Sequence, residues 1–186
     1  MKKIATLVAT VMILMGTASV AKADAGDKIL LYIPNRILDM ADMFSVTLGF
    51  GPAIGVKAHL TRYCALGGEV GFTSQIVKGI NRQYGFAREN GWDASFLMIS
   101  AQNRERDESM GSVKDYYYYS TGIPEMDKVP YDFHNGAEDF WSIGAKLAAL
   151  IELKAELHPV EIADFLLGLA FIDIKGDDIT ADDVDE

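Results

Sequence analysis

From Ser142 to His158 every odd-numbered residue is apolar and most even-numbered residues are polar or glycine, and this pattern constrains the fold more than any other feature. A helix is excluded, because its 3.6-residue period would scatter the apolar positions around the cylinder. At roughly 3.3 Å per residue a single strand of this length is unusually long, so it is either bent or divided near residues 148–150. The apolar positions are Ile143, Ala145, Leu147, Ala149, Ile151, Leu153, Ala155 and Leu157.

The same two-residue period occurs in the first third of the chain, where it predicts a meander of three strands. Glycines gather on the polar side of these segments, which indicates strong curvature or close backbone approach. A mixed-charge run at 103–109 predicts a solvated loop, and 123–135 predicts a long loop. The candidate strands are 45–51, 54–62, 64–73, 84–90, 92–101, 112–120, 141–149 and 150–158.

Two helices flank the strands in the sequence. Residues 24–33 read as a lead-in to an amphipathic helix with Pro34 in its first turn, and Pro159 opens a second helix that ends near Gly168. We therefore expect an α+β fold, mainly antiparallel β, as a curved sheet or partly closed barrel. The apolar sheet face and the two helices are expected to form the core.

The N-terminus has the three parts of an export signal. Lys2 and Lys3 precede an apolar run from Ile4 to Val20, and Ala21-Lys22-Ala23 matches the small-x-small cleavage pattern. An uncleaved membrane anchor is the alternative, at the lower limit of spanning length. We expect a signal peptide at 1–23, one β-rich domain at 24–172 and an acidic tail at 173–186.

Charge and cysteine content limit the function further. The chain has 17 basic and 27 acidic residues, a net charge of −10, which argues against a nucleic-acid partner. Its single cysteine, Cys64, cannot form an internal disulfide, and its place in an alternating pattern predicts a small buried side chain.

Glu156, His158 and Glu161 are the candidate metal ligands. Imidazole and carboxylate groups together suit a divalent metal, and His59 and Glu69 could join them if the strand order allows. The alternative is structural: His158 would pack at the start of the helix, and Glu161 would favour its dipole.

The acidic tail offers a second candidate metal site. Asp173, Asp177 and Asp178 could bind calcium, although the EF-hand pattern is not matched. A solvated tail without a ligand is the alternative.

Tyr116, Tyr117, Tyr118 and Tyr119 form the densest aromatic run and would place two rings on each face of a strand. Such a surface could bind a glycan or an envelope protein, and aromatic rings also gather at membrane interfaces. Cross-strand packing is the simpler alternative.

No well-known catalytic motif is present. Gly49–Gly55 lies between strands rather than before a helix, which argues against phosphate binding. The Gly-x-Ser-x-Gly pattern is absent, and only His59, His134 and His158 could serve as a triad base.

Two stretches, 45–61 and 158–168 with 172–178, resemble a loose group of uncharacterised exported proteins of Gram-negative bacteria. The resemblance implies a location in the periplasm or outer membrane, and it implies no catalytic residue. We expect a non-enzymatic envelope protein with a binding or structural role. The alternatives are a small eight-stranded outer-membrane β-barrel and a metal-dependent enzyme using His158, Glu156 and Glu161.

Overall fold

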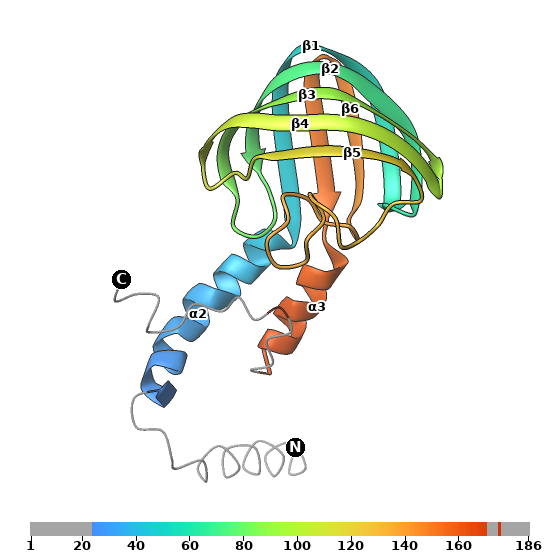
Figure 1. Ribbon diagram of the computed structural model, residues 1–186. Helices are drawn as coiled ribbons and strands as arrows, with labels where there is room; N and C mark the ends of the chain where they lie inside the picture. The colour runs from blue at the N-terminus through green and yellow to red at the C-terminus, as the bar shows by residue number, and fades with distance from the viewer. Residues whose placement is uncertain (1–23, 171–174, 176–186) are drawn as a thin grey trace. The chain divides into compact units, whose positions relative to one another are not determined.

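The computed structural model describes residues 24–170 and Lys175. Over these residues it consists of one six-stranded antiparallel sheet and two helices, which confirms the predicted α+β class (Figure 1). The elements are α2 (Asp24–Asp42), β1 (Phe44–Thr61), β2 (Cys64–Lys78), β3 (Tyr84–Leu97), β4 (Ile99–Gly111), β5 (Tyr116–Gly122), β6 (Ile143–Leu157) and α3 (Pro159–Gly168). The described residues from Arg36 onward form a compact unit that contains the whole sheet and α3, whereas residues 24–35 belong to a second unit.

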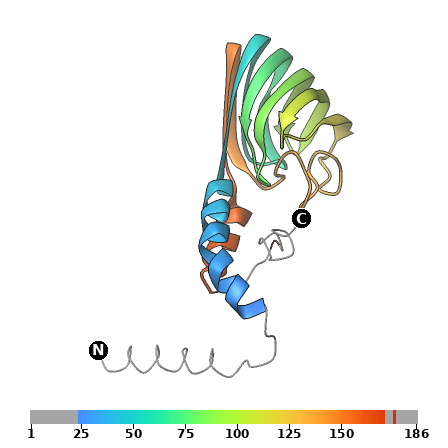
Figure 2. The ribbon, with the colours of Figure 1, turned by 90° about the vertical axis from the view of Figure 1, so that its left-hand side faces the viewer.

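The strand order is β5-β4-β3-β2-β1-β6, so the sheet is an open, curved one with β5 and β6 at its edges (Figure 2). Five strands follow one another as a meander, and β6 returns to pair with the free side of β1. The irregular segment 123–142 makes this connection. Of the two predicted forms, the structure has the curved sheet and not the partly closed barrel.

The expectation of eight strands was wrong, because three of the predicted boundaries do not exist. β1 runs through Pro52 with a register shift between Phe50 and Ile54. β6 is one bent strand, in which Leu150 adopts a left-handed backbone conformation with φ 67°. The predicted strands 84–90 and 92–101 belong mainly to β3, and the β3–β4 turn falls at 97–99.

Residues 103–109 lie within β4 and do not form the predicted solvated loop. Arg104 and Arg106 are buried on one face of the strand, while Glu105 and Asp107 point outward. Because both faces of this part of β4 carry charged residues, its inward and outward positions do not differ in hydrophobicity. The strand is therefore not visible in a hydrophobicity pattern. The N-terminal helix also begins earlier than predicted, at Asp24, with Pro34 inside it. The second helix begins at Pro159 as predicted.

The two sheet faces are reversed relative to the prediction. The apolar side chains of β6, β1 and β2 are exposed on the convex side, so the apolar face is not the core. This surface, named here the outer apolar face, comprises Phe44, Val46, Leu48, Phe50, Ile54, Val56, Leu60, Leu66, Val70, Phe72, Ile76, Ile143, Leu147, Ile151, Leu153 and Leu157. Cys64 points outward with this face and is exposed, contrary to its predicted burial. Neither described helix is long and apolar enough to cross a bilayer.

The polar face is enclosed by the curl of the sheet. Lys146 on β6 lies 2.7 Å from Glu69 on β2 and 3.5 Å from Glu89 on β3. Two strands separate β3 from β6, so only strong curvature brings these side chains together. A small aromatic cluster of Tyr116, Tyr118, Tyr131 and Phe140 packs between β5 and the 123–142 segment.

Glycine makes this curvature sterically accessible. Gly67 has φ 109°, and a Cβ atom placed there would lie 2.1 Å from the carbonyl oxygen of Val56 on the adjacent strand. Of the two alternatives predicted for glycines on the polar side, this position shows the close backbone approach.

Replacing Gly67 with alanine is expected to lower the free energy of unfolding by about 2–4 kcal/mol, through both the clash and the unfavourable φ. Gly122→Ala is a matched control, because Gly122 has φ 116° but open space around its Cβ position. Urea unfolding of both variants measures the difference. Equal losses would show that the close approach at Gly67 is unimportant.

Candidate functional site

The enclosed face carries a network of ion pairs and one separate pair, formed by side chains from five strands and two connecting segments. Among the described residues, six basic and six acidic side chains take part, so their formal charges balance. The connected members are Arg62, Arg104, Arg106, Lys146, Lys154, Glu69, Glu89, Glu138, Glu152 and Glu156, and Lys57 and Asp93 form a separate pair on the same face.

Glu138, on the 123–142 segment, is at the centre of this network. Arg104 donates to both of its carboxylate oxygens, at 3.2 and 2.7 Å. Arg62 donates at 3.3 Å and Lys154 at 3.2 Å. Glu138, which is only 3% exposed, therefore ties β4, β6 and the turn after β1 to the connecting segment. A buried carboxylate with three cationic partners is strongly held in its ionised form.

Burial alone would raise the pKa of Glu138, but Arg104, Lys154 and Arg62 outweigh it and hold that pKa well below its usual range. The stability contributed by ionised Glu138 is therefore fully present above the unfolded pKa of about 4.5. It is lost as the pH falls toward the lowered value of the folded state.

The free energy of unfolding of the wild type is thus expected to fall as the pH drops below about 4.5. The fall should be steeper in the wild type than in Glu138→Gln, which has no carboxyl group to titrate at this position. The midpoints of urea unfolding at pH 7, 5, 4 and 3 measure how stability changes with pH in the wild type and in the variant. Parallel slopes would contradict the assignment of this pH dependence to Glu138.

Beside the network, His158 joins two side chains that are far from it in the sequence. Its Nδ1 atom lies 2.9 Å from Asp139 Oδ2, and its Nε2 atom lies 3.1 Å from Ser45 Oγ. Ser45 is the first buried residue of β1, and His158 follows β6 as the N-cap residue of α3. The imidazole is fully buried and Ser45 is 6% exposed.

Glu156 lies next to this group on the enclosed face. Ser45 Oγ is 3.3 Å from Glu156 Oε2, and Arg62 and Lys154 each lie 3.0 Å from the same carboxylate. His59 Nε2 is 3.2 Å from Glu156 Oε1 and 3.0 Å from Ser142 Oγ. Of the two residues that could join the candidate metal ligands, His59 therefore contacts Glu156.

The structure does not bring the three predicted metal ligands together. Glu156 binds cations, His158 binds Asp139 and Ser45, and Glu161 pairs with Lys175. Glu69, the other proposed addition, pairs with Lys146. Among the described residues no group of three or more His, Cys, Asp or Glu side chains is arranged to hold a metal ion. Asp173, Asp177 and Asp178, proposed for calcium, lie outside the described residues.

The tyrosine run divides between the two faces of β5 as its alternation predicts. Tyr116 and Tyr118 are buried, whereas Tyr117 and Tyr119 are 62% and 63% exposed. The Tyr116 hydroxyl donates to Glu89 at 3.2 Å, and its ring lies beneath Arg106 at 5.0 Å. Only half of the run is therefore available as a binding surface.

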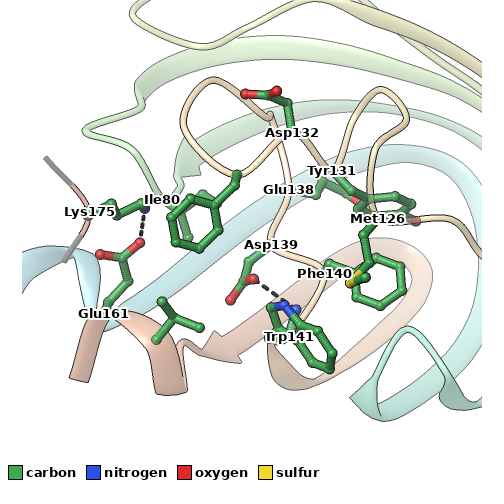
Figure 3. Close-up of a pocket in the computed structure, with 12 residues that line it drawn as sticks. Ile80, Met126, Tyr131, Asp132, Glu138, Asp139, Phe140, Trp141, Glu161 and Lys175 are labelled. Carbon is green, nitrogen blue, oxygen red and sulfur yellow. Dashed lines mark hydrogen bonds and ion pairs between the residues drawn. The ribbon is translucent and has the colours of Figure 1, made fainter. Parts of the chain in front are cut away.

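A cavity of about 130 Å³ lies between the 123–142 segment and α3 (Figure 3). Asp139 and the Glu161–Lys175 pair are part of its wall. Its apolar lining is Ile80, Met126, Phe133, Phe140, Trp141 and Val160. A second cavity of about 10 Å³ is lined by Ser45, Glu156 and Asp139, and it shares Ile80, Glu138 and Asp139 with the first.

Sequence reasoning selected Glu156 and His158 but missed Ser45, Asp139 and Glu138. The pairing of Ser45 with Glu156 across β1 and β6 is a matter of strand register. Asp139 and Glu138 lie in an irregular segment without periodicity. Comparison with known proteins adds no assignment, because no family model, curated protein or solved structure matches the chain.

Proposed function

We propose that this is an exported cell-envelope protein whose outer apolar face lies in the hydrocarbon of a lipid bilayer. The distribution of side chains between the two sheet faces is the observation that carries the proposal. Over the described lengths of β6 and β1, and along β2 as far as Ile76, no outward position bears a charged side chain. The other charged residues of these strands point to the enclosed face, except Lys78 at the end of β2, which pairs with Asp42.

Exposing an apolar surface as large as the outer apolar face to water is unfavourable in free energy. The largest apolar patch of a typical soluble monomer is about 300–600 Å² and commonly marks an interaction site. Ile54 and Val56, near the middle of the outer apolar face, are 69% and 65% exposed. A bilayer accepts such side chains without requiring any polar partner, whereas a protein interface has a polar rim.

The length of the face also fits a bilayer. From Phe44 to Leu60 the outward positions of β1 extend over roughly 50 Å of strand. Tilted by about 45°, such a strand rises by roughly 35 Å, which exceeds the hydrocarbon thickness of about 30 Å.

The outer side of β4 marks the limit of the face. Glu105 and Asp107 point outward there, and Arg88 on β3 pairs with Glu108. The lipid-facing surface therefore centres on β6, β1 and β2. The N-terminal signal pattern and the resemblance to exported proteins support delivery to the cell envelope.

Fractionation of a Gram-negative host that expresses the full chain tests the proposal. We expect the protein in the membrane pellet after carbonate washing, with detergent needed for its release. The purified protein should float with phosphatidylcholine vesicles in a density gradient. Recovery in the soluble periplasmic fraction without detergent would overturn the proposal.

A further inference from the structure

Ser45, His158 and Asp139 form a continuous chain of hydrogen bonds, with 3.1 Å between Ser45 Oγ and His158 Nε2 and 2.9 Å between His158 Nδ1 and Asp139 Oδ2. The three residues come from β1, from the junction of β6 with α3, and from the 123–142 segment. A hydroxyl, an imidazole and a carboxylate in this order are the parts of an activated oxygen nucleophile.

The carboxylate decides the tautomer of the imidazole. An ionised carboxylate only accepts hydrogen bonds, so Asp139 requires a proton on His158 Nδ1. In the neutral ring Nε2 then carries a lone pair and accepts from the Ser45 hydroxyl. Glu156 Oε2 is the competing acceptor at 3.3 Å, but its charge is already compensated by Arg62 and Lys154, each at 3.0 Å.

We infer that Ser45 is a nucleophile toward carboxylic esters, with His158 as its general base and Asp139 as a positioning residue. Ser45 Oγ forms a bond to the ester carbonyl carbon while its proton passes to His158 Nε2. The carbon–oxygen bond to the leaving alcohol breaks, and His158 returns the proton to that alcohol. Water then attacks the acyl carbon and gives a proton to His158. The bond from that carbon to Ser45 Oγ breaks, His158 returns the proton to Ser45 Oγ, and a carboxylic acid is released.

The neighbouring space indicates the size of the acyl group. The 130 Å³ cavity is apolar along most of its wall and shares Ile80, Glu138 and Asp139 with the small cavity at Ser45. A dry apolar cavity of about 150 Å³ is known to hold benzene. A short acyl chain of about four to six carbons therefore fits, whereas a long fatty acyl chain exceeds this volume.

The same sheet face contains an internal comparison. Ser142 Oγ lies 3.0 Å from His59 Nε2, but His59 Nδ1 has no hydrogen-bond partner among the described residues. The second serine–histidine pair lacks the carboxylate that would fix the ring, so it should be far less reactive. This inference departs from the expected non-enzymatic role, and it does not depend on membrane insertion.

Reaction of the purified full chain with a fluorophosphonate tests the inference directly, because the adduct is located by peptide mass spectrometry in the unmodified protein. We expect one adduct, on Ser45 and not on Ser142. Labelling should be lost in His158→Ala. Asp139→Asn should slow it by at least about 100-fold, and the conservative variant Asp139→Glu should recover part of the rate.

Turnover provides a second readout. p-Nitrophenyl butyrate should be hydrolysed at least about 100-fold faster by the wild type than by Ser45→Ala, and faster than the palmitate ester. Circular dichroism of each variant shows whether it is folded. Wild-type protein without an adduct on Ser45, or hydrolysis at the same rate in Ser45→Ala, would overturn the inference.

Discussion

Replacing Glu138 with glutamine is expected to lower the free energy of unfolding by about 3–5 kcal/mol. The substitution keeps the shape of the side chain and removes only its charge. Arg104, Arg62 and Lys154 would then remain buried without the carboxylate that each contacts within 3.3 Å. Glu156 and Glu89 would still compensate them in part, but the enclosed network would keep one unbalanced positive charge, and an uncompensated buried charge is strongly destabilising.

Urea or thermal unfolding measures this loss, and Glu125→Gln is the matched control. Glu125 also pairs with a lysine, Lys128, at 3.4 Å, but its side chain is 62% exposed. A solvated pair of this kind contributes little, so the control should stay within about 0.5 kcal/mol of the wild type. A loss at Glu138 as small as that of the control would show that the enclosed network does not hold the sheet together.

A double-mutant cycle measures the interaction energy between Arg104 and Glu138 apart from their other contacts. Arg104→Met should also destabilise the protein, since it leaves charge on Glu138 partly uncompensated. The double variant Arg104→Met/Glu138→Gln should lose clearly less than the sum of the single losses, because neither partner is then stranded. Additive losses would exclude a direct interaction between them.

Val56→Arg is expected to reduce the binding of the protein to phosphatidylcholine vesicles by roughly 30- to 900-fold. An arginine on the lipid face of a membrane strand costs about 2–4 kcal/mol at the middle of the bilayer. Val56 is 65% exposed at the centre of the outer apolar face, so the substitution should leave the fold intact. Flotation of the purified variant in a density gradient measures the change.

Tyr117→Arg is the control for this experiment. Tyr117 is 62% exposed on β5, outside the outer apolar face, and receives the same charge. It should bind vesicles within about threefold of the wild type. If Val56→Arg binds as well as the Tyr117 variant, the outer apolar face does not contact lipid.

The sequence was sufficient to predict the class of fold, because two-residue periodicity in residues 142–158 survives any choice of partner strand. It was not sufficient to predict which face is enclosed. Periodicity assigns side chains to two sides, and apolar residues normally occupy the inner one. Here the inner side is stabilised by Glu138, which pairs with Arg104 and Arg62. These two residues lie 34 and 76 positions earlier in the chain.

The candidate site was predictable only in part for the same reason. His158 was recognisable from its place between a strand and a helix-opening proline. Ser45 lies 113 residues away and meets it through the register of β1 with β6. Asp139 approaches from a segment whose conformation no local pattern specifies. Tertiary packing, rather than residue type, creates the hydrogen-bonded chain.

The position of β6 at the rim of the sheet limits the states in which the protein can exist. Among the described residues its 15-residue backbone is bonded to β1 alone, so the opposite side presents a row of amides and carbonyls. In hydrocarbon each such unpaired group costs several kcal/mol. A form of the protein inserted in a membrane must therefore pair the free edge of β6 with a further strand. In water the same free edge is a template for aggregation.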